Sequence, residues 1–303
     1  MKYANGIREL IGNTPLIKLN NFQVEKGINI FAKLEGQNPG GSCKDRIGLY
    51  MVEKAEREGL LKKGGTIVEA TAGNTGIGIA LASLNKGYRV IFVIPEKFSI
   101  EKQTLLKALG AELIITPKER GMVGACDKAE ELLKNIPQSL SLKQFENDSN
   151  PLAHYETTGK EIYAQLDGHI NYVVGGAGSG GTITGVLKYI KEKNSDVKGV
   201  LADPYGSTIG GGEEGCYKIE GIGNNFIPKT MNLSYIDIVK KVRDDEAFYY
   251  VKELAKREGI IVGSSSGAAM AAAIALTKDI DRGNIVVIFP DRGDRYFSKN
   301  IFD

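Results

Sequence analysis

The chain alternates short runs of apolar, often β-branched residues with longer segments whose apolar positions recur at helical spacing. Several short runs are apolar throughout, which is typical of strands buried on both faces of a sheet. The predicted strands are residues 29–34, 66–70, 89–94, 112–116, 172–175, 199–202 and 284–289. The predicted helices are residues 45–58, 75–86, 100–109, 124–133, 152–165, 182–192, 245–257 and 266–277. This order predicts an α/β protein with mostly parallel sheets and right-handed crossovers.

These strand–helix units fall into two groups, separated by the polar stretch QFENDSNP at residues 144–151. We therefore expect two three-layer αβα domains, residues 1–146 and residues 147–303, with residues 45–146 as the mobile part of the first. In sheets of this kind, ligands bind beyond the carboxyl ends of the strands or between domains.

Composition and charge exclude several classes of protein. The chain has 38 glycines in 303 residues, whereas average usage would give about 21. Apolar residues at 42% and balanced charges exclude a collagen-like or disordered chain, so the extra glycine belongs to particular loops. The formal net charge of +2 gives no reason to expect nucleic acid or an anionic membrane surface as a partner.

The sequence also shows no signal peptide, no membrane-spanning segment and no metal-binding motif. The N-terminus lacks the apolar core of a signal peptide, and no apolar run approaches the roughly 20 residues of a membrane span. Three widely spaced cysteines indicate neither a disulfide framework nor a zinc ribbon, and they fit a reducing, cytoplasmic setting. Two histidines are too few for a His-rich metal site.

The richest glycine loop, GGAGSGGT at residues 175–182, joins a predicted strand to a predicted helix. Glycines let the backbone approach a ligand closely, and the N–H groups at a helix start bind anions. The loop also matches the dinucleotide fingerprint, with Asp203 in the place of a ribose-binding acid, so this loop alone leaves an NAD enzyme open. Ser179 and Thr182 weaken that alternative because their hydroxyls suit a compact terminal phosphate, and Pro204 after Asp203 is unhelpful to it.

A second loop, NPGGSCKDR at residues 38–46, places Lys44 at the start of a predicted helix. It is not a Walker A motif, because Asp45 follows the lysine and the glycine spacing differs. Most lysines are solvated surface groups. The positive end of a helix dipole, however, disfavours a cation, and a lysine held there is a candidate Schiff-base nucleophile.

Two further loops, each before a predicted helix, offer neutral hydrogen-bonding groups. TAGNTG at residues 71–76 suits a carboxylate, unless Asn74 only caps its helix. VGSSSG at residues 262–267 either caps the following Ala-rich helix or places a neutral hydroxyl against a heteroaromatic nitrogen. Together, the four loops predict binding sites for a phosphate, an aldehyde, a carboxylate-bearing substrate and a ring nitrogen. Pyridoxal 5′-phosphate acting on an amino acid presents these four groups.

With these motifs in this order, essentially the whole chain resembles the cysteine synthase / cystathionine β-synthase family, the fold type II (tryptophan synthase β-like) pyridoxal-phosphate enzymes. NPGGSCKDR is similar to the family's NPSGSVKDR, TAGNTG to TSGNTG, and GAGSGGT to GVGTGGT. The resemblance implies that Lys44 holds the cofactor as a Schiff base, Asn74 contacts its 3′-oxygen and Ser265 faces its pyridine nitrogen. It implies a phosphate site at Gly178, Ser179, Gly180, Gly181 and Thr182. It implies a substrate site at Thr71, Ala72, Gly73, Thr75, Gln144, Glu220 and Gly221, and no metal.

Some positions bear on the substrates. Ala72 replaces the family's usual serine, and Glu220 brings a carboxylate to a loop that faces the substrate in the family. The segments PEKFSIEKQ (residues 95–103) and DRYFSKNIF (residues 294–302) resemble the bacterial O-acetylserine-dependent cystathionine β-synthase-like branch more than general cysteine synthases. The family implies a homodimer acting on amino-acid, thiol or sulfide substrates, with no nucleic acid and no membrane as partners.

The implied reaction is β-replacement on cysteine, serine or O-acetylserine. Lys44 removes the Cα proton, the β-leaving group departs to give an aminoacrylate, and a thiol or sulfide adds at Cβ. Glu220 motivates an amino-thiol acceptor, because a carboxylate binds an amino group. The alternatives are a cysteine lyase that releases hydrogen sulfide and gives lanthionine or serine, dehydratase-like deamination, and a catalytically idle relative that binds partners.

Three remaining residues are expected to take no part in the chemistry. Cys43 beside Lys44 is expected to be a small packed side chain instead of a redox group. His154 and His169 are expected to be structural or exposed, so that the acid–base work falls to one lysine.

Overall fold

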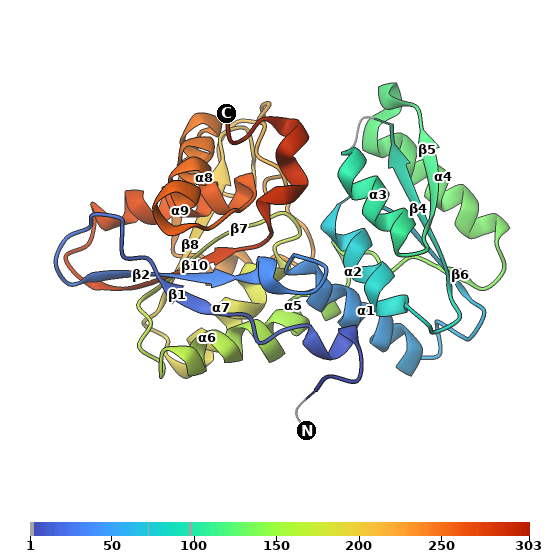
Figure 1. Ribbon diagram of the computed structural model, residues 1–303, viewed down its shortest axis with the longest axis horizontal. Coiled ribbons are helices and arrows are strands. Elements are labelled where there is room, and N and C mark those ends of the chain that lie inside the picture. The colour runs from blue at the N-terminus through green and yellow to red at the C-terminus, as the bar shows by residue number, and fades with distance from the viewer. Residues whose placement is uncertain (1–2, 72, 97–98) are drawn as a thin grey trace.

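The computed structural model describes residues 3–71, 73–96 and 99–303. These residues form two lobes, each with a sheet between layers of helices (Figure 1). One sheet has six strands in the order β1-β2-β10-β7-β8-β9, and the other has four in the order β5-β4-β3-β6. Every strand pair is parallel except β1 with β2. The expected α/β class with mostly parallel sheets is confirmed.

The described strands are β1 Leu16–Lys18, β2 Ile28–Leu34, β3 Thr66–Ala70, β4 Arg89–Pro95, β5 Glu112–Thr116, β6 Ser139–Leu140, β7 Tyr172–Gly176, β8 Lys198–Pro204, β9 Ile238–Val242 and β10 Gly283–Phe289. The α-helices are α1 Lys44–Arg57, α2 Asn74–Ser83, α3 Ile100–Ala108, α4 Gly121–Asn135, α5 Ser149–Ala153, α6 Gly159–Gln165, α7 Gly181–Lys193, α8 Asp244–Glu258 and α9 Ser264–Thr277. The short helices are η1 Ile7–Leu10, η2 Glu35–Gln37, η3 Lys118–Arg120, η4 His154–Thr158, η5 Leu233–Tyr235 and η6 Gly293–Lys299; η4 is a π-helical turn and the rest are 3₁₀.

The four-stranded sheet is buried on both faces, as its continuous apolar strands predict. Successive side chains of a strand point to opposite faces, so Ile67 packs with α1 and α2, while the next residue, Val68, packs with α4. In the six-stranded sheet, Val174 likewise faces the α9 side and Val173 the α7 side. Each sheet therefore has one apolar cluster on each face, and the carboxyl ends of the strands remain available for the site.

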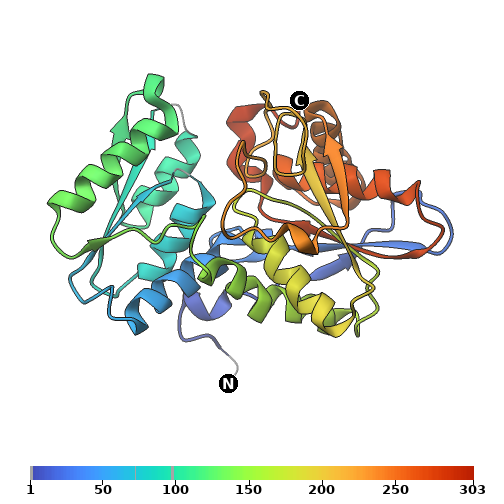
Figure 2. The ribbon, with the colours of Figure 1, turned by 180° about the vertical axis from the view of Figure 1, so that it is seen from behind.

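The sheets divide the chain differently from the expected boundary between residues 146 and 147. Strands β1 and β2 belong to the six-stranded sheet, because β2 pairs along its whole length with β10. The blue N-terminal strands accordingly lie in the orange and yellow lobe, as both views show (Figures 1 and 2). The four-stranded sheet is built from strands between Thr66 and Leu140. The proposed mobile part, residues 45–146, covers this sheet and its helices.

Most predicted elements appear within a few residues of their expected bounds. The sequence pattern missed β1, β6 and β9, which have only three, two and five residues. The predicted helix at residues 152–165 begins earlier, at Ser149, and contains the wide turn η4. No helix of the described residues is long and apolar enough to cross a membrane.

Candidate active site

Lys44 is the first residue of α1, at the end of the loop that follows β2. Its Nζ atom lies 3.2 Å from the Sγ atom of Cys43. Cys43 is buried, and burial raises the pKa of its thiol despite the nearby ammonium group. The expected packed thiol is what the geometry shows, and Lys44 projects from it into the cavities described below.

A buried ion-pair network fixes the start of α1. Arg46 is fully buried and donates to both carboxylate oxygens of Glu35, at 2.7 and 2.8 Å, and to both of Glu161, at 2.6 and 2.8 Å. Burial alone would raise the pKa of Glu35, but the charge and hydrogen bonds of Arg46 outweigh it and hold that pKa below its usual value. Burial would also raise the pKa of Glu161, but the hydrogen bonds and charges of Arg46 and Lys33 hold it at about 2. Lys44 therefore lies two residues before Arg46, whose side chain is held in place by Glu35 and Glu161.

The residues of the four loops converge on a cavity of about 630 Å3, here called the main cavity. The predicted site residues that line it are Lys44, Thr71, Gly73, Asn74, Thr75, Gln144, Gly178, Ser179, Glu220, Gly221 and Ser265. A smaller inner pocket of about 30 Å3 shares Lys44 and Gly178 with it and is also lined by Gly180 and Thr182. Lys44 and Ser265, more than 200 positions apart in the sequence, therefore line the same cavity, into which the Lys44 amine projects.

The glycine loop packs tightly against its own lobe and leaves a helix N-terminus facing the inner pocket. Gly180 precedes α7 in a left-handed conformation with φ of 76°, and a Cβ there would lie 2.5 Å from the Cβ of Met231. A Cβ on Gly178 would collide with the carbonyl oxygen of Gly221, and one on Gly181 with Oδ1 of Asn150. Gly181 thus serves packing and is the one described member of the predicted phosphate site outside the cavity walls.

Buried neutral groups hold the hydroxyls of this loop. Nδ2 of Asn150 donates to the hydroxyl of Ser179 at 2.9 Å. The hydroxyl of Thr182 lies 3.0 Å from Nε2 of His154, whose Nδ1 lies 2.9 Å from the hydroxyl of Thr158. Burial lowers the pKa of His154 to about 3, so the ring is neutral. The wide turn η4 carries this histidine, which is structural as expected; its contact with Thr182 was not predicted.

The loop after β3 also lines the main cavity. The hydroxyl of Thr75 donates to Oε1 of Gln144 at 2.6 Å, which joins two of the predicted carboxylate-binding residues. Gly73, not Asn74, is the N-cap of α2. The Asn74 amide donates to Asp291 at 2.7 Å and accepts from Arg295 at 2.5 Å. Asn74 is therefore oriented by the other lobe, and its capping alternative is wrong.

Ser265 lies in the first turn of α9 and is almost fully buried. The N-cap of α9 is Gly263, so the serine is not the cap. Its neighbour Ser264 accepts a hydrogen bond from the backbone N–H of Glu220 at 3.0 Å. The Ser265 hydroxyl has no hydrogen-bond partner among the described residues, and it lines the main cavity. It offers a neutral group to a ring nitrogen.

Glu220 lines the same cavity but is not free. Its Oε2 atom lies 3.1 Å from Nζ of Lys102, and its Oε1 atom lies 3.5 Å from Nζ of Lys299. Lys102 also stands 4.3 Å above the ring of Tyr296. We call Lys102, Glu220 and Lys299 the charged rim. Sequence reasoning missed both lysines, although they lie in the two segments, 95–103 and 294–302, that it singled out.

The acid of the dinucleotide alternative lies elsewhere. Asp203 is buried and forms an ion pair with Lys241 at 2.7 Å, and it accepts from the backbone N–H of Gly210 at 3.0 Å. It lines neither the main cavity nor the inner pocket. The fingerprint match therefore lacks an available ribose-binding acid.

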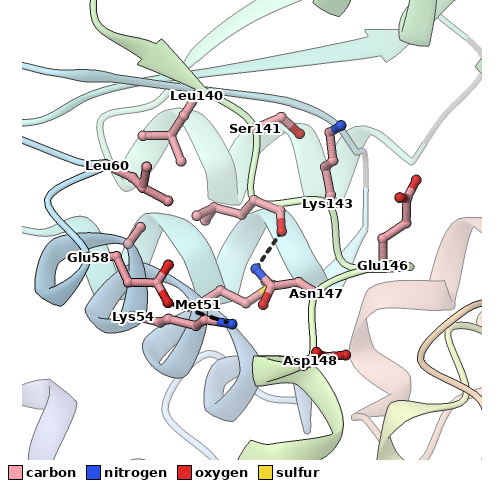
Figure 3. Close-up of a pocket in the computed structure, with 12 residues that line it drawn as sticks. Met51, Lys54, Glu58, Leu60, Leu140, Ser141, Lys143, Glu146, Asn147 and Asp148 are labelled. Carbon is pink, nitrogen blue, oxygen red and sulfur yellow. Dashed lines mark hydrogen bonds and ion pairs between the residues drawn. The ribbon is translucent and has the colours of Figure 1, made fainter.

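A separate pocket of about 260 Å3 lies between α1, β6 and the link to α5 (Figure 3). Lys54 of α1, Glu58 just after it, and the link residues Lys143 and Asn147 are among the residues that line it. The Asn147 amide donates to the carbonyl of Leu142 at 2.8 Å. No predicted site residue that the structure describes lines this pocket, so it is distinct from the candidate active site. Ala72, one of the predicted substrate contacts, lies outside the described residues.

The residues present fit pyridoxal phosphate. A glycine-lined helix N-terminus suits the phosphate, because its N–H groups and dipole favour an anion. Lys44 lines both the main cavity and the inner pocket; Ser265 and Asn74 line the main cavity with it. One amine, one anion site and one neutral hydroxyl around a single cavity are the donor set that the cofactor requires.

Comparison with known proteins gives the same assignment. The family model described as "Pyridoxal-phosphate dependent enzyme" matches residues 7–291. The chain is 50% identical over 304 residues to the O-acetylserine dependent cystathionine beta-synthase of Bacillus subtilis, covering 100% of this chain and 99% of that protein. It is 45% identical over 304 residues to the cysteine synthase of Staphylococcus aureus, covering 99% and 98%. A hydrogen sulfide-producing enzyme from Fusobacterium nucleatum superposes with a TM-score of 0.93 at 42% identity, covering 97% and 100%.

The chain therefore belongs to the cysteine synthase / cystathionine β-synthase family of pyridoxal-phosphate dependent enzymes, and its cofactor is pyridoxal phosphate.

Proposed function

We propose that this family member catalyses β-replacement on an amino acid with a leaving group at Cβ, forming or breaking a C–S bond. The observation that carries the proposal is that Lys44, the glycine loop and the Thr75–Gln144 pair line one cavity. The relatives named above are, by name, an O-acetylserine dependent cystathionine beta-synthase, a cysteine synthase and a hydrogen sulfide-producing enzyme. These names support a reaction of this kind, with O-acetylserine, serine or cysteine as the candidate donor.

Each wall of the cavity has one task. Thr71, Gly73, Thr75 and Gln144 bind the substrate carboxylate. When bound, pyridoxal phosphate supplies an electron sink for the negative charge that develops at Cα. Lys44 Nζ takes the Cα proton as the β-substituent leaves, and it returns that proton after the thiol or sulfide has added at Cβ. Ser265 presents a neutral hydroxyl instead of a carboxylate, which favours elimination and replacement over transamination.

The first test concerns Lys44. The purified protein is expected to be yellow, to lose its colour on borohydride reduction, and to carry the reduced cofactor on the peptide that contains Lys44, as seen by mass spectrometry. Lys44→Ala is expected to lower turnover by about 10²–10⁴-fold, the usual contribution of a positioned acid–base group. A colourless protein that takes up no pyridoxal phosphate contradicts the proposal.

The second test identifies the reaction by its products. Cysteine, serine and O-acetylserine are supplied one at a time, each alone and with homocysteine or sulfide. Release of acetate or hydrogen sulfide together with a new thioether or cysteine supports β-replacement. Hydrogen sulfide from cysteine alone, with lanthionine or serine, identifies the lyase alternative, which the similarity to a hydrogen sulfide-producing enzyme favours. Pyruvate as the main product identifies deamination.

The assembly and location of the protein are also part of this proposal. A homodimer is supported by the exposed side chains of Ile100 and Leu105, which line a largely apolar groove of about 630 Å3 beside α2 and α3. Light scattering after size exclusion tests it, and a mass of 32.8 kDa in solution contradicts it. A cytoplasmic location is supported by three cysteines that are all free thiols.

A further inference from the structure

Glu69 is a buried carboxylate in β3, two residues before the loop that begins at Thr71. A glutamate is almost never buried unless its carboxylate is paired. Its Oε1 atom accepts from the backbone N–H of Lys143 at 3.0 Å, from that of Leu142, and from the hydroxyl of Ser141 at 2.9 Å. Burial raises the pKa of this carboxyl, and the three hydrogen bonds oppose that rise. One oxygen therefore holds three consecutive residues of another segment.

These hydrogen bonds begin where the pairing of β3 with β6 stops. Strand β6 has only two residues, and the last of them, Leu140, pairs with Ile67. In the same register, Glu69 would lie opposite Leu142, and at that point its side chain accepts the backbone N–H groups of the other segment. Lys143, with a left-handed φ of 51°, begins the turn that follows. The carboxylate thus holds the segment up to that turn.

The next residue, Gln144, lines the main cavity. Its Oε1 atom accepts from the hydroxyl of Thr75 at 2.6 Å, and its carbonyl oxygen accepts from Nδ2 of Asn150 at 2.8 Å. Thr75 belongs to the segment that follows β3, whereas Gln144 follows β6. The two parts of the proposed carboxylate site therefore come from two neighbouring strands, and the buried side chain of Glu69 joins the ends of those strands.

We propose that Glu69 is a positioning residue for the substrate carboxylate site, because it fixes the segment after β6 and thereby holds Gln144 against Thr75. Glu69 itself lines neither the main cavity nor the inner pocket, so it acts through Gln144. This inference rests on the proposed function, in which Gln144 and the loop after β3 bind the substrate carboxylate.

The competing role for Glu69 is a staple that only stabilises the four-stranded sheet. Loss of a staple would weaken every ligand of the cavity alike. Loss of a positioning residue would weaken only ligands that carry the carboxylate. The two roles therefore differ in the preference for a carboxylate over a neutral group.

The test compares alanine with alaninamide, in which a neutral amide replaces the carboxylate. Neither has a leaving group at Cβ, so both bind the holoenzyme without β-replacement, and the change in cofactor absorbance gives each Kd. The native protein is expected to bind alanine about tenfold to a hundredfold more tightly than alaninamide, the value of a hydrogen bond to a charged group.

Glu69→Gln keeps the shape of the side chain but weakens it as an acceptor, because hydrogen bonds to ionised groups are the stronger ones. This variant is expected to reduce the preference for alanine by about threefold to tenfold, the value of one ordinary hydrogen bond. Glu69→Asp keeps the charge but ends one methylene group short, and it is expected to reduce the preference in the same way. Equal weakening of both ligands in these variants shows a staple and overturns the proposal.

The matched control is Glu112→Gln, a change in β5 of the same sheet. The carboxylate of Glu112 is exposed and pairs with Arg89 at 2.7 Å, away from both cavities. This variant is expected to keep the native preference for alanine.

A double-mutant cycle with Gln144→Ala tests the route by which Glu69 acts. Gln144→Ala alone is expected to lower the preference for alanine. In that background, Glu69→Gln is expected to change the preference by less than about twofold, because the side chain that it positions is gone. Effects that add in the double variant show that Glu69 acts elsewhere, and they overturn the proposal.

The same measurements separate the two levels of failure. If the native protein does not prefer alanine, or if Gln144→Ala leaves the preference unchanged, the carboxylate site of the proposed function is wrong and this inference falls with it. If Gln144→Ala lowers the preference and neither variant of Glu69 does, only the positioning role is wrong.

Discussion

The inner end of the cavity is made of backbone and buried neutral groups, whereas the charged rim is made of long ionised side chains. At the inner end, Gly178 and Gly180 lie so close to neighbouring atoms that a Cβ has no room, and the neutral His154 supports Thr182. At the rim, Glu220 and Lys299 remain 35% and 42% exposed. A small change in side-chain volume destabilises a closely packed interior. The loss of an exposed ion pair changes stability little, because long exposed side chains can rearrange.

This difference indicates that the inner end is suited to binding the cofactor and the rim to contacting the substrate. The inner end has one arrangement and suits the cofactor, which is common to the family. At the rim, Glu220 and Lys299 are partly exposed and can exchange partners at little cost, whereas Lys102 is only 6% exposed. The following three predictions test the comparison, from the largest expected effect to the smallest.

Removing the buried cation beneath Lys44 is expected to have the largest effect on stability. Arg46→Met leaves Glu35 buried without its partner, which costs about 3–5 kcal/mol of unfolding free energy. Lys299→Met at the rim removes a half-exposed charge and is expected to change stability by less than about 0.5 kcal/mol. Urea unfolding of both variants checks the difference. Similar losses in the two variants would mean that the regions do not differ in rigidity.

A methyl group in the glycine loop is expected to have an intermediate effect. Gly178→Ala drives a Cβ into the carbonyl of Gly221, and overpacking of this kind costs about 1–3 kcal/mol. We expect pyridoxal phosphate to bind about 10–100-fold more weakly, as measured by equilibrium dialysis. Gly73→Ala is the control, because a Cβ there meets nothing within 4 Å. Unchanged affinity in Gly178→Ala would show that the loop adapts.

The smallest effect, measured over the one pH unit below 6.5, is a pH dependence that arises from His154. Its pKa is about 3 when folded, so the unfolded chain takes up a proton below its ordinary value of 6.5 that the folded chain refuses. This contribution to stability is complete above pH 6.5 and falls by about 1.4 kcal/mol for each pH unit below it, until about pH 3.

His154→Gln keeps a hydrogen-bonding side chain and removes that titration. Between pH 6.5 and 5.5, the native protein is therefore expected to lose about 1 kcal/mol more than the variant. The measurement uses protein stripped of cofactor, so that no phosphate charge near Thr182 contributes. Parallel pH profiles for the two proteins would place the histidine in contact with water.

The inner end could be predicted from sequence because its information is local. Glycine spacing, a lysine at a helix start and serines before an Ala-rich helix each lie within one loop. Two of these loops follow β2 and β7 of the same sheet, whose parallel order places them at one edge. The structure brings Lys44, Asn74, Gln144 and Ser265 to one cavity as that reasoning expects. The role of each residue toward the cofactor and substrate remains a proposal.

The rim could not be predicted because its residues are far apart and ordinary by themselves. Lys102 and Glu220 are separated by 118 positions, and most lysines face solvent. Nor does the sequence show that Asp291 and Arg295 orient Asn74, or that η4 carries His154 to Thr182. The expected domain boundary differs from the sheets for the same reason, since β1 and β2 pair with a strand near the end of the chain.

By itself, the sequence determined the α/β class, the loops that bear the chemistry, and pyridoxal phosphate as the cofactor, because hydrophobic period and glycine spacing act over a few residues. Only the tertiary structure decided which charges face one another at the cavity, and that the one fingerprint acid, Asp203, is already paired with Lys241. Those contacts depend on how the two sheets and their helices pack, and packing places side chains together without regard to their distance along the chain.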